Sequence, residues 1–180
     1  MTVPDNLLIR LLHPDDKPGK FSLGSQEFQP LKTFLKRDAH AHDKANISKT
    51  FVLVEGEEPV NRIFGYVTLV CSEIANANDT RLDDCEQANR YPTFPAVKLA
   101  RLAIHKDLQG YGLGQQMLWW TVAHIMQNVV PHAGCRFLVV DAKKGAVKFY
   151  EKAGFTLLDT PDNIHADSSV MFIDLQKLMS

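Results

Sequence analysis

The chain has 180 residues, of which 45% are hydrophobic and 23% are charged, and its formal net charge is −1. A chain of this length buries roughly 70% of its unfolded surface, so we expect one soluble domain over residues 1–180. No apolar run approaches the ~20 residues of a membrane-spanning helix, which excludes a protein that crosses a membrane in this way.

The first residues, 1–6, lack the basic start and the long apolar stretch of a signal peptide, so we expect a cytoplasmic protein. The three cysteines, Cys71, Cys85 and Cys135, are odd in number and widely spaced. None belongs to a Cys-x-x-Cys pair. This pattern is typical of reduced thiols rather than of a disulfide framework.

The first predicted elements are a strand, a helix and a hairpin. Residues 7–12 form a short apolar run that ends in a polar turn, which predicts a strand. A helix is predicted to begin near Gln29, because Pro30 is tolerated only in a first helical turn. The apolar runs at residues 51–54 and 63–70 are separated by turn residues and predict the hairpin.

The middle of the chain contains a polar stretch, a buried strand and a long helix. Residues 72–95 predict a long loop with one helical turn, and loops of this length are often functional. Residues 97–105 predict a central strand that is buried on both faces in its second half. The helix that follows has an apolar stripe that ends before Pro131. Its members are Leu118, Val122, Ile125, Met126 and Val129.

The last part of the chain alternates between strands and helices. Short strands are predicted at residues 137–140, 155–158 and 171–173, and a short helix at 144–153. Such alternation after an early hairpin predicts an α/β protein with a mixed sheet and helices on both of its faces.

The segment from Leu102 to Gly114 is the most informative part of the sequence. It reads as an apolar strand that runs into a glycine-rich turn and opens a helix, with the spacing Gln109-x-x-Gly112-x-Gly114. The glycines remove side chains where a ligand could approach the backbone, and the helix start presents unpaired N–H groups to an anion. The spacing is neither that of a dinucleotide-binding turn nor that of a P-loop.

This turn is followed, about one helix and one strand later, by Phe149-Tyr150-Glu151-Lys152-Ala153-Gly154-Phe155. Together the two motifs resemble the GCN5-related N-acetyltransferase (GNAT) family over roughly residues 50–175. The resemblance implies the GNAT fold, a mixed and mostly antiparallel sheet flanked by helices on both faces. It also implies an enzyme that transfers acetyl from acetyl-CoA to a primary amine. In the alternative reading, the glycines only form a tight turn and Phe149 and Tyr150 only pack a helix on the sheet.

The resemblance assigns the binding of acetyl-CoA to the strand end and the turn. The strand offers backbone groups to the acetyl and pantetheine portion, and the turn offers N–H groups to the pyrophosphate. The implied residues are Leu102, Ala103, Ile104, Gln109, Gly110, Tyr111, Gly112, Leu113 and Gly114.

Tyr150 matches the tyrosine that commonly protonates the leaving thiolate in this family, so it is the implied general acid. A phenol suits this role because its reference pKa of about 10 keeps it protonated at neutral pH.

The general base is less clear, because residues 97–104 contain no acid where many relatives carry a glutamate. This strand offers only Lys98 and Arg101. An α-amine has a pKa near 8, against about 10.4 for lysine, so the missing base indicates an α-amine acceptor or deprotonation through water.

Three further motifs resemble the acetyltransferase toxins of toxin–antitoxin pairs: Phe21-x-x-Gly24, Arg101-Leu-Ala103 and Asp141-Ala-Lys143. Those toxins acetylate the α-amine of aminoacyl-tRNA. The narrower resemblance therefore implies tRNA as the acceptor and an antitoxin protein as a partner.

Basic residues are the candidate RNA contacts in this reading, and a solvated basic surface is the alternative. They are Lys36, Arg37, Lys44, Lys49 and Arg101. The net charge of −1 lacks the basic excess that is typical of an RNA-binding domain, although a local patch or the groove of a homodimer would supply it.

Two other functions stay open at this point. One is an acetyltransferase for a small amine or a protein amine, in which residues 72–95 shape the acceptor pocket. The other is a non-catalytic module that binds acetyl-CoA. The substitution Tyr150→Phe separates them, because only an enzyme loses its rate while it keeps acetyl-CoA binding.

The histidines do not predict a metal site. His40, His42 and Asp43 form a cluster that resembles a set of metal ligands, but a solvated helix end is the better interpretation. His105 ends the central strand where the toxin-like relatives usually carry an aspartate, so its role stays open. His124 is interpreted as a helix-surface or satisfied buried histidine.

Overall fold

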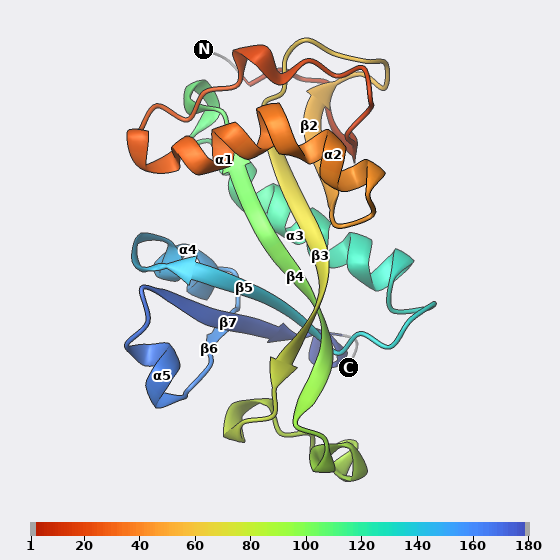
Figure 1. Ribbon diagram of the computed structural model, residues 1–180, viewed down its shortest axis with the longest axis vertical. Helices are drawn as coiled ribbons and strands as arrows, with labels where there is room; N and C mark the ends of the chain where they lie inside the picture. Colours follow the sequence, from red (N-terminus) through yellow and green to blue (C-terminus); the bar gives the residue numbers. More distant parts are fainter. Residues whose placement is uncertain (1–2, 179–180) are drawn as a thin grey trace. The chain divides into compact units, whose positions relative to one another are not determined.

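A computed structural model describes residues 3–178 of the chain (Figure 1). Seven strands of these residues hydrogen-bond in the order β1-β2-β3-β4-β5-β7-β6. The strands are β1 (Leu7–Leu11), β2 (Lys49–Glu55), β3 (Gly65–Ala75), β4 (Thr93–Ile104), β5 (Phe137–Lys143), β6 (Thr156–Leu157) and β7 (Ser168–Asp174). The α-helices are α1 (Gln29–Thr33), α2 (Ala39–Lys44), α3 (Leu113–Asn128), α4 (Val147–Lys152) and α5 (Pro161–Ile164).

The chain forms two compact units, and each is described by itself. Unit 1 consists of Met1–Val70 and Ala100–Thr121, and unit 2 of Cys71–Leu99 and Val122–Ser180. The expectation of a single domain over residues 1–180 stays a prediction.

In the sheet of unit 1, β2 lies between β1 and β3 and is antiparallel to both. Strand β1 pairs with β2, and β2 pairs with β3 in a register that sets Phe51 opposite Val67. The predicted hairpin is therefore confirmed. Its strands begin and end within a few residues of the apolar runs that predicted them.

The two faces of β2 bury different helices, because side chains alternate along a strand. On one face Val52 and Val54 pack with Phe34 and Leu35 of the helical segment between β1 and β2. On the other face Phe51 contacts Trp120 of α3, with ring centroids 5.1 Å apart. The sheet of unit 1 therefore has helices on both faces, as predicted (Figure 1).

The helical segment of unit 1 contains one irregular turn. Helix α1 begins at Gln29, as Pro30 predicted, and a 3₁₀ turn capped by the Ser25 side chain precedes it. Residues Phe34–Asp38 (η3) form a π-helical turn between α1 and α2. Turns of this kind are rare and are frequently found at functional sites.

Among the glycines of unit 1 for which an added β-carbon is described, Gly65 has the least space for a side chain. A β-carbon there would lie 2.7 Å from Ile104 Cδ1, 2.9 Å from Met117 Sδ and 3.1 Å from the carbonyl oxygen of Ala103. We expect Gly65→Ala to lower the free energy of unfolding by about 1–3 kcal/mol, because an overpacked core must shift. Urea denaturation measures this change, and an unchanged midpoint would contradict the close packing.

In unit 2 the sheet is mixed. Residues Ala96–Lys98 of β4 pair in parallel with Phe137–Val139 of β5, whereas β5–β7 and β6–β7 are antiparallel. Its core includes Ile74, Leu82, Phe94, Phe137, Val139, Leu158 and Phe172. The prediction of a mixed and mostly antiparallel sheet is confirmed.

The predicted loop at residues 72–95 is shorter than expected. Strand β3 continues to Ala75 and β4 already begins at Thr93, while 3₁₀ turns occupy Asn78–Thr80 and Glu86–Arg90. Ile74 lies between Glu73 and Ala75, and Phe94 lies between Thr93 and Pro95; both are buried and pack into the core of unit 2. One large apolar residue in each stretch gives too little alternation to predict a strand.

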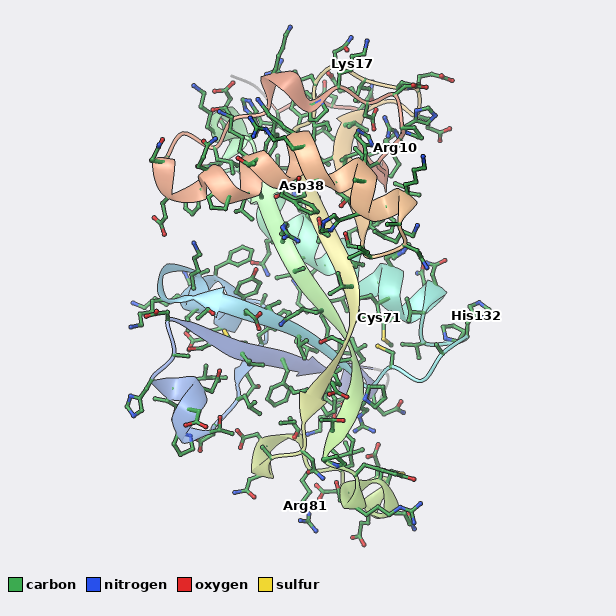
Figure 2. All side chains as sticks on the ribbon, in the orientation of Figure 1. Arg10, Lys17, Asp38, Cys71, Arg81 and His132 are labelled. Atoms are coloured by element: carbon green, nitrogen blue, oxygen red, sulfur yellow. The ribbon has the colours of Figure 1, made fainter. Side chains whose placement is uncertain are left out.

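The cysteines are free, and Cys71 (Figure 2) and Cys85 are exposed. Within residues 3–178, no helix is long and apolar enough to span a bilayer. Over the same residues, no group of three or more histidine, cysteine or acidic side chains could hold a metal ion.

Candidate active site

The glycine-rich turn of unit 1 connects the end of β4 to the start of α3. A 3₁₀ turn, Lys106–Leu108 (η6), follows His105, and the chain then passes through Gln109–Gly112 before α3 begins at Leu113. Gly110 and Gly112 have φ angles of +86° and +78°. Residues with a β-carbon rarely adopt this left-handed backbone conformation, so the path of the turn requires glycine at these two positions.

The start of α3 has the geometry of an anion-binding site. The N–H of Gln116 donates to the carbonyl of Gly112 at 3.1 Å, which makes Gly112 the N-cap. The N–H groups of Leu113, Gly114 and Gln115 therefore have no carbonyl partner inside the helix. A β-carbon added at Gly110 or Gly112 would meet no protein atom within 4 Å. The turn thus leaves open space beside Gly110 and Gly112, next to a helix start of the kind that binds phosphate.

Gln109 fixes the turn to its surroundings. Its side-chain amide donates to the carbonyl of Ile104 at 3.0 Å and to that of Leu23 at 3.5 Å. The side chain is thus engaged with protein backbone, and it positions the turn. Tyr111 is exposed, and its side chain lines a cavity of about 650 Å³ together with residues of β1 and α3.

His105 supports the same turn, a role that the sequence left open. His105 is only 6% exposed. Nδ1 accepts the N–H of Asp107 at 3.3 Å, and Nε2 lies 3.3 Å from the carbonyl of Lys20. If Nδ1 accepts, Nε2 must carry the proton that it donates to Lys20. Nδ1 also lies 3.5 Å from a carboxylate oxygen of Asp107, so the ring is held at both of its nitrogens and caps η6.

Tyr150 lies on α4 in unit 2 and is 9% exposed. Its ring packs edge-on against Phe149 and Phe155, at centroid distances of 5.1 and 5.3 Å. Burial raises the pKa of Tyr150 to about 12. Among residues 3–178, no group forms a hydrogen bond with its hydroxyl. The phenol is thus protonated and has its proton available for a ligand.

Tyr66 is also buried, but its hydroxyl has a hydrogen-bond partner within the protein. Its hydroxyl donates to the carbonyl of Leu31 at 2.7 Å, and burial raises its pKa. The fold already uses this hydroxyl, so burial alone does not identify the candidate acid. The partner-free hydroxyl is what distinguishes Tyr150.

The nine predicted cofactor-binding residues are brought together in unit 1, where they run from the end of β4 into the first turn of α3. Ala103 and Ile104 are buried, and Leu102 is half-buried. Tyr150 belongs to unit 2, where its surroundings are those described above.

The candidate RNA contacts differ in their surroundings. Lys36 donates to the carbonyl of Gly19, and Lys49 forms an ion pair with Asp43 at 3.0 Å. Arg37 and Lys44 are exposed to solvent.

The mixed sheet and the glycine-rich turn that opens α3 are those of an acetyltransferase. A family model described as an acetyltransferase (GNAT) domain matches residues 46–157, more than half of the chain. The chain therefore belongs to the GNAT acetyltransferase family. It is an N-acetyltransferase, and acetyl-CoA is its acetyl donor.

Solved structures with the same fold include KacT and the toxin AtaT. A tyrosine-to-phenylalanine variant of KacT is 26% identical, with a TM-score of 0.78 over 97% of this chain and 98% of that chain. AtaT complexed with acetyl-methionyl-tRNAfMet is 22% identical, with a TM-score of 0.78 over 96% of this chain and 97% of that one. A tyrosine-to-phenylalanine variant of the toxin AtaT, bound to the C-terminus of the antitoxin AtaR and acetyl-CoA, is 23% identical; its TM-score is 0.76, over 97% and 96% of the two chains.

Proposed function

We propose that the protein transfers acetyl from acetyl-CoA to the α-amine of an aminoacyl-tRNA. The observation that carries this proposal is the composition of β4, which has no acidic residue from Thr93 to Ile104. A site without a base on this strand suits an amine that loses its proton readily, and an α-amine with a pKa near 8 does so far more easily than a lysine. The complex of AtaT with acetyl-methionyl-tRNAfMet supports the same acceptor.

In this proposal, unit 1 holds the donor. Backbone groups of Leu102, Ala103 and Ile104 bind the acetyl and pantetheine portion, and the first N–H groups of α3 bind the pyrophosphate. Gln109 and His105 keep the turn in place through their bonds to backbone groups. Acetyl-CoA supplies the acetyl group as a thioester.

Tyr150 acts as the general acid. The acceptor nitrogen forms a bond to the carbonyl carbon, and the bond from this carbon to sulfur breaks. Tyr150 gives its phenolic proton to the departing sulfur, and the nitrogen releases a proton to water. Structures of tyrosine-to-phenylalanine variants of both KacT and AtaT have been solved, which is in keeping with a tyrosine of this importance.

We also propose that the protein is a cytoplasmic toxin and that its partner is an antitoxin protein, as AtaT binds AtaR. We propose further that it can act as a homodimer. The net charge of −1 favours the other candidate, an acetyltransferase for a small amine or a protein amine.

Labelled acetyl-CoA tests the proposal. The wild-type protein is incubated with a mixture of aminoacyl-tRNAs, with deacylated tRNA, and with small amines and peptides. We expect label on the aminoacyl-tRNAs and none on deacylated tRNA, which lacks the α-amine. Label on small amines or peptides alone would overturn the tRNA proposal and leave the other acceptors.

A further inference from the structure

Arg101 of β4 is a half-buried cation without an anionic partner. Its guanidinium lies over the ring of Phe34, 3.7 Å from the ring centroid. Among residues 3–178, no carboxylate lies within 4.0 Å of it and no hydrogen bond uses its N–H groups. The fork of five donors is thus available, and its geometry matches the oxygens of a phosphate or a carboxylate.

Two other half-buried arginines, in contrast, are each hydrogen-bonded to an aspartate. Arg10 (Figure 2) forms two hydrogen bonds with Asp16, at 2.8 and 2.9 Å. Arg136 forms two with Asp174, at 2.7 and 2.8 Å. Partly buried guanidinium groups are normally paired in this way. Arg101 has an aromatic ring in place of the carboxylate, so its charge is positioned but not neutralised.

The position of Phe34 explains how Arg101 is held. Phe34 is the first residue of the π-helical turn η3 and is buried. Its ring contacts Tyr66 and His42, at centroid distances of 6.3 and 5.3 Å. The ring is therefore fixed by its neighbours. A fixed ring under a guanidinium favours one orientation of the cation and lets it keep its donors for a ligand.

We propose that Arg101 binds a phosphodiester of the acceptor tRNA. This inference rests on the proposed function and names the residue that recognises the acceptor. The amino acid of an aminoacyl-tRNA has its carboxyl group tied up in an ester, so the acceptor end offers phosphodiesters as its anions. A guanidinium can bind two oxygens of one phosphate at once, which an ammonium cannot.

The test compares two acceptors that share the reacting group. Methionyl-tRNA and methionine methyl ester both present an α-amine beside an ester, but only the tRNA carries phosphates. Arg101→Gln is expected to raise KM for methionyl-tRNA by about 10- to 100-fold and to leave kinetics on the methyl ester nearly unchanged. The dependence of tRNA affinity on salt is expected to become shallower by about one unit in its log–log slope.

Three variants serve as controls. Arg101→Lys keeps the charge but loses the fork, so it is expected to fall between wild type and Arg101→Gln. Phe34→Leu is expected to weaken tRNA binding because it removes the support of the guanidinium. Arg90→Gln removes the same charge from an exposed guanidinium that lies 5.0 Å from the ring centroid of Tyr91. It is expected to leave KM for methionyl-tRNA and the kinetics on the methyl ester unchanged.

The outcomes separate the two proposals. If the wild-type protein acetylates no aminoacyl-tRNA, the proposed function fails and the role of Arg101 fails with it. If the wild-type protein acetylates aminoacyl-tRNA, but Arg101→Gln changes the kinetics on both acceptors equally or on neither, only the role of Arg101 is overturned. Thermal unfolding of each variant shows whether an equal loss comes from an altered fold.

Discussion

Replacing Tyr150 by phenylalanine is expected to lower kcat for acetyl transfer by about 100-fold or more, with an unchanged Kd for acetyl-CoA. The ring is buried between Phe149 and Phe155, so phenylalanine fills the same space. No described residue loses a hydrogen bond, because none bonds the hydroxyl. The change removes the proton donor alone. Stopped-flow kinetics and calorimetric titration with acetyl-CoA measure the two quantities.

The pH dependence of the wild-type enzyme follows from the same burial. Because burial raises the pKa of Tyr150 to about 12, the phenol keeps its proton throughout the range from pH 6 to 10. The rate is therefore expected to rise with pH through the pKa of the acceptor amine, near 8 for an α-amine, and to show no alkaline decline below about pH 10. An alkaline decline centred between pH 8 and 9 would contradict Tyr150 as the acid.

Tyr66→Phe is the matched control for Tyr150→Phe. It removes a hydroxyl that donates to the carbonyl of Leu31 at 2.7 Å. The carbonyl of Leu31 then keeps only the N–H of Phe34 as a donor, so the free energy of unfolding is expected to fall by about 0.5–1.5 kcal/mol while kcat stays normal. Tyr150→Phe is expected to show the reverse pattern. If Tyr150→Phe keeps its kcat, another group supplies the proton or the protein is an acetyl-CoA-binding module.

Local patterns predicted the parts of the site that depend on neighbours in sequence. Leu102 to Gly114 could be interpreted as strand, turn and helix because glycine, apolar runs and helix starts have local signatures. The left-handed conformations at Gly110 and Gly112 agree with that interpretation. The hairpin between β2 and β3 was predictable for the same reason.

Contacts between distant residues could not be predicted in this way. Gln109 bonds the carbonyl of Leu23, and His105 lies 3.3 Å from that of Lys20, each more than 80 residues away. Motif spacing assigned Gln109 to the turn that binds the cofactor, and this assignment stays a prediction; the bond of its side-chain amide to the carbonyl of Ile104 had no signal in the sequence. The stacking of Arg101 on Phe34 depends on a π-helical turn, for which the sequence has no recognisable signal.

Gly112→Ala is expected to raise the Kd for acetyl-CoA by about 10- to 100-fold. In the protein alone, the added β-carbon meets nothing within 4 Å, so no side chain has to move. The open space is where we propose that the pyrophosphate approaches the first N–H groups of α3, and a methyl group there keeps the phosphate oxygens beyond hydrogen-bond distance. Calorimetric titration measures the affinity.

The strain of the substitution has to be separated from this loss of binding. An alanine at a φ of +78° lowers the free energy of unfolding by about 1–2 kcal/mol. Gly56, in the turn between β2 and β3, has a φ of +84° and nothing within 4 Å of its added β-carbon. Gly56→Ala therefore carries the same strain and is expected to keep the wild-type Kd. Equal weakening of acetyl-CoA binding in both variants would mean that strain, and not the approach of the phosphate, explains the glycine at position 112.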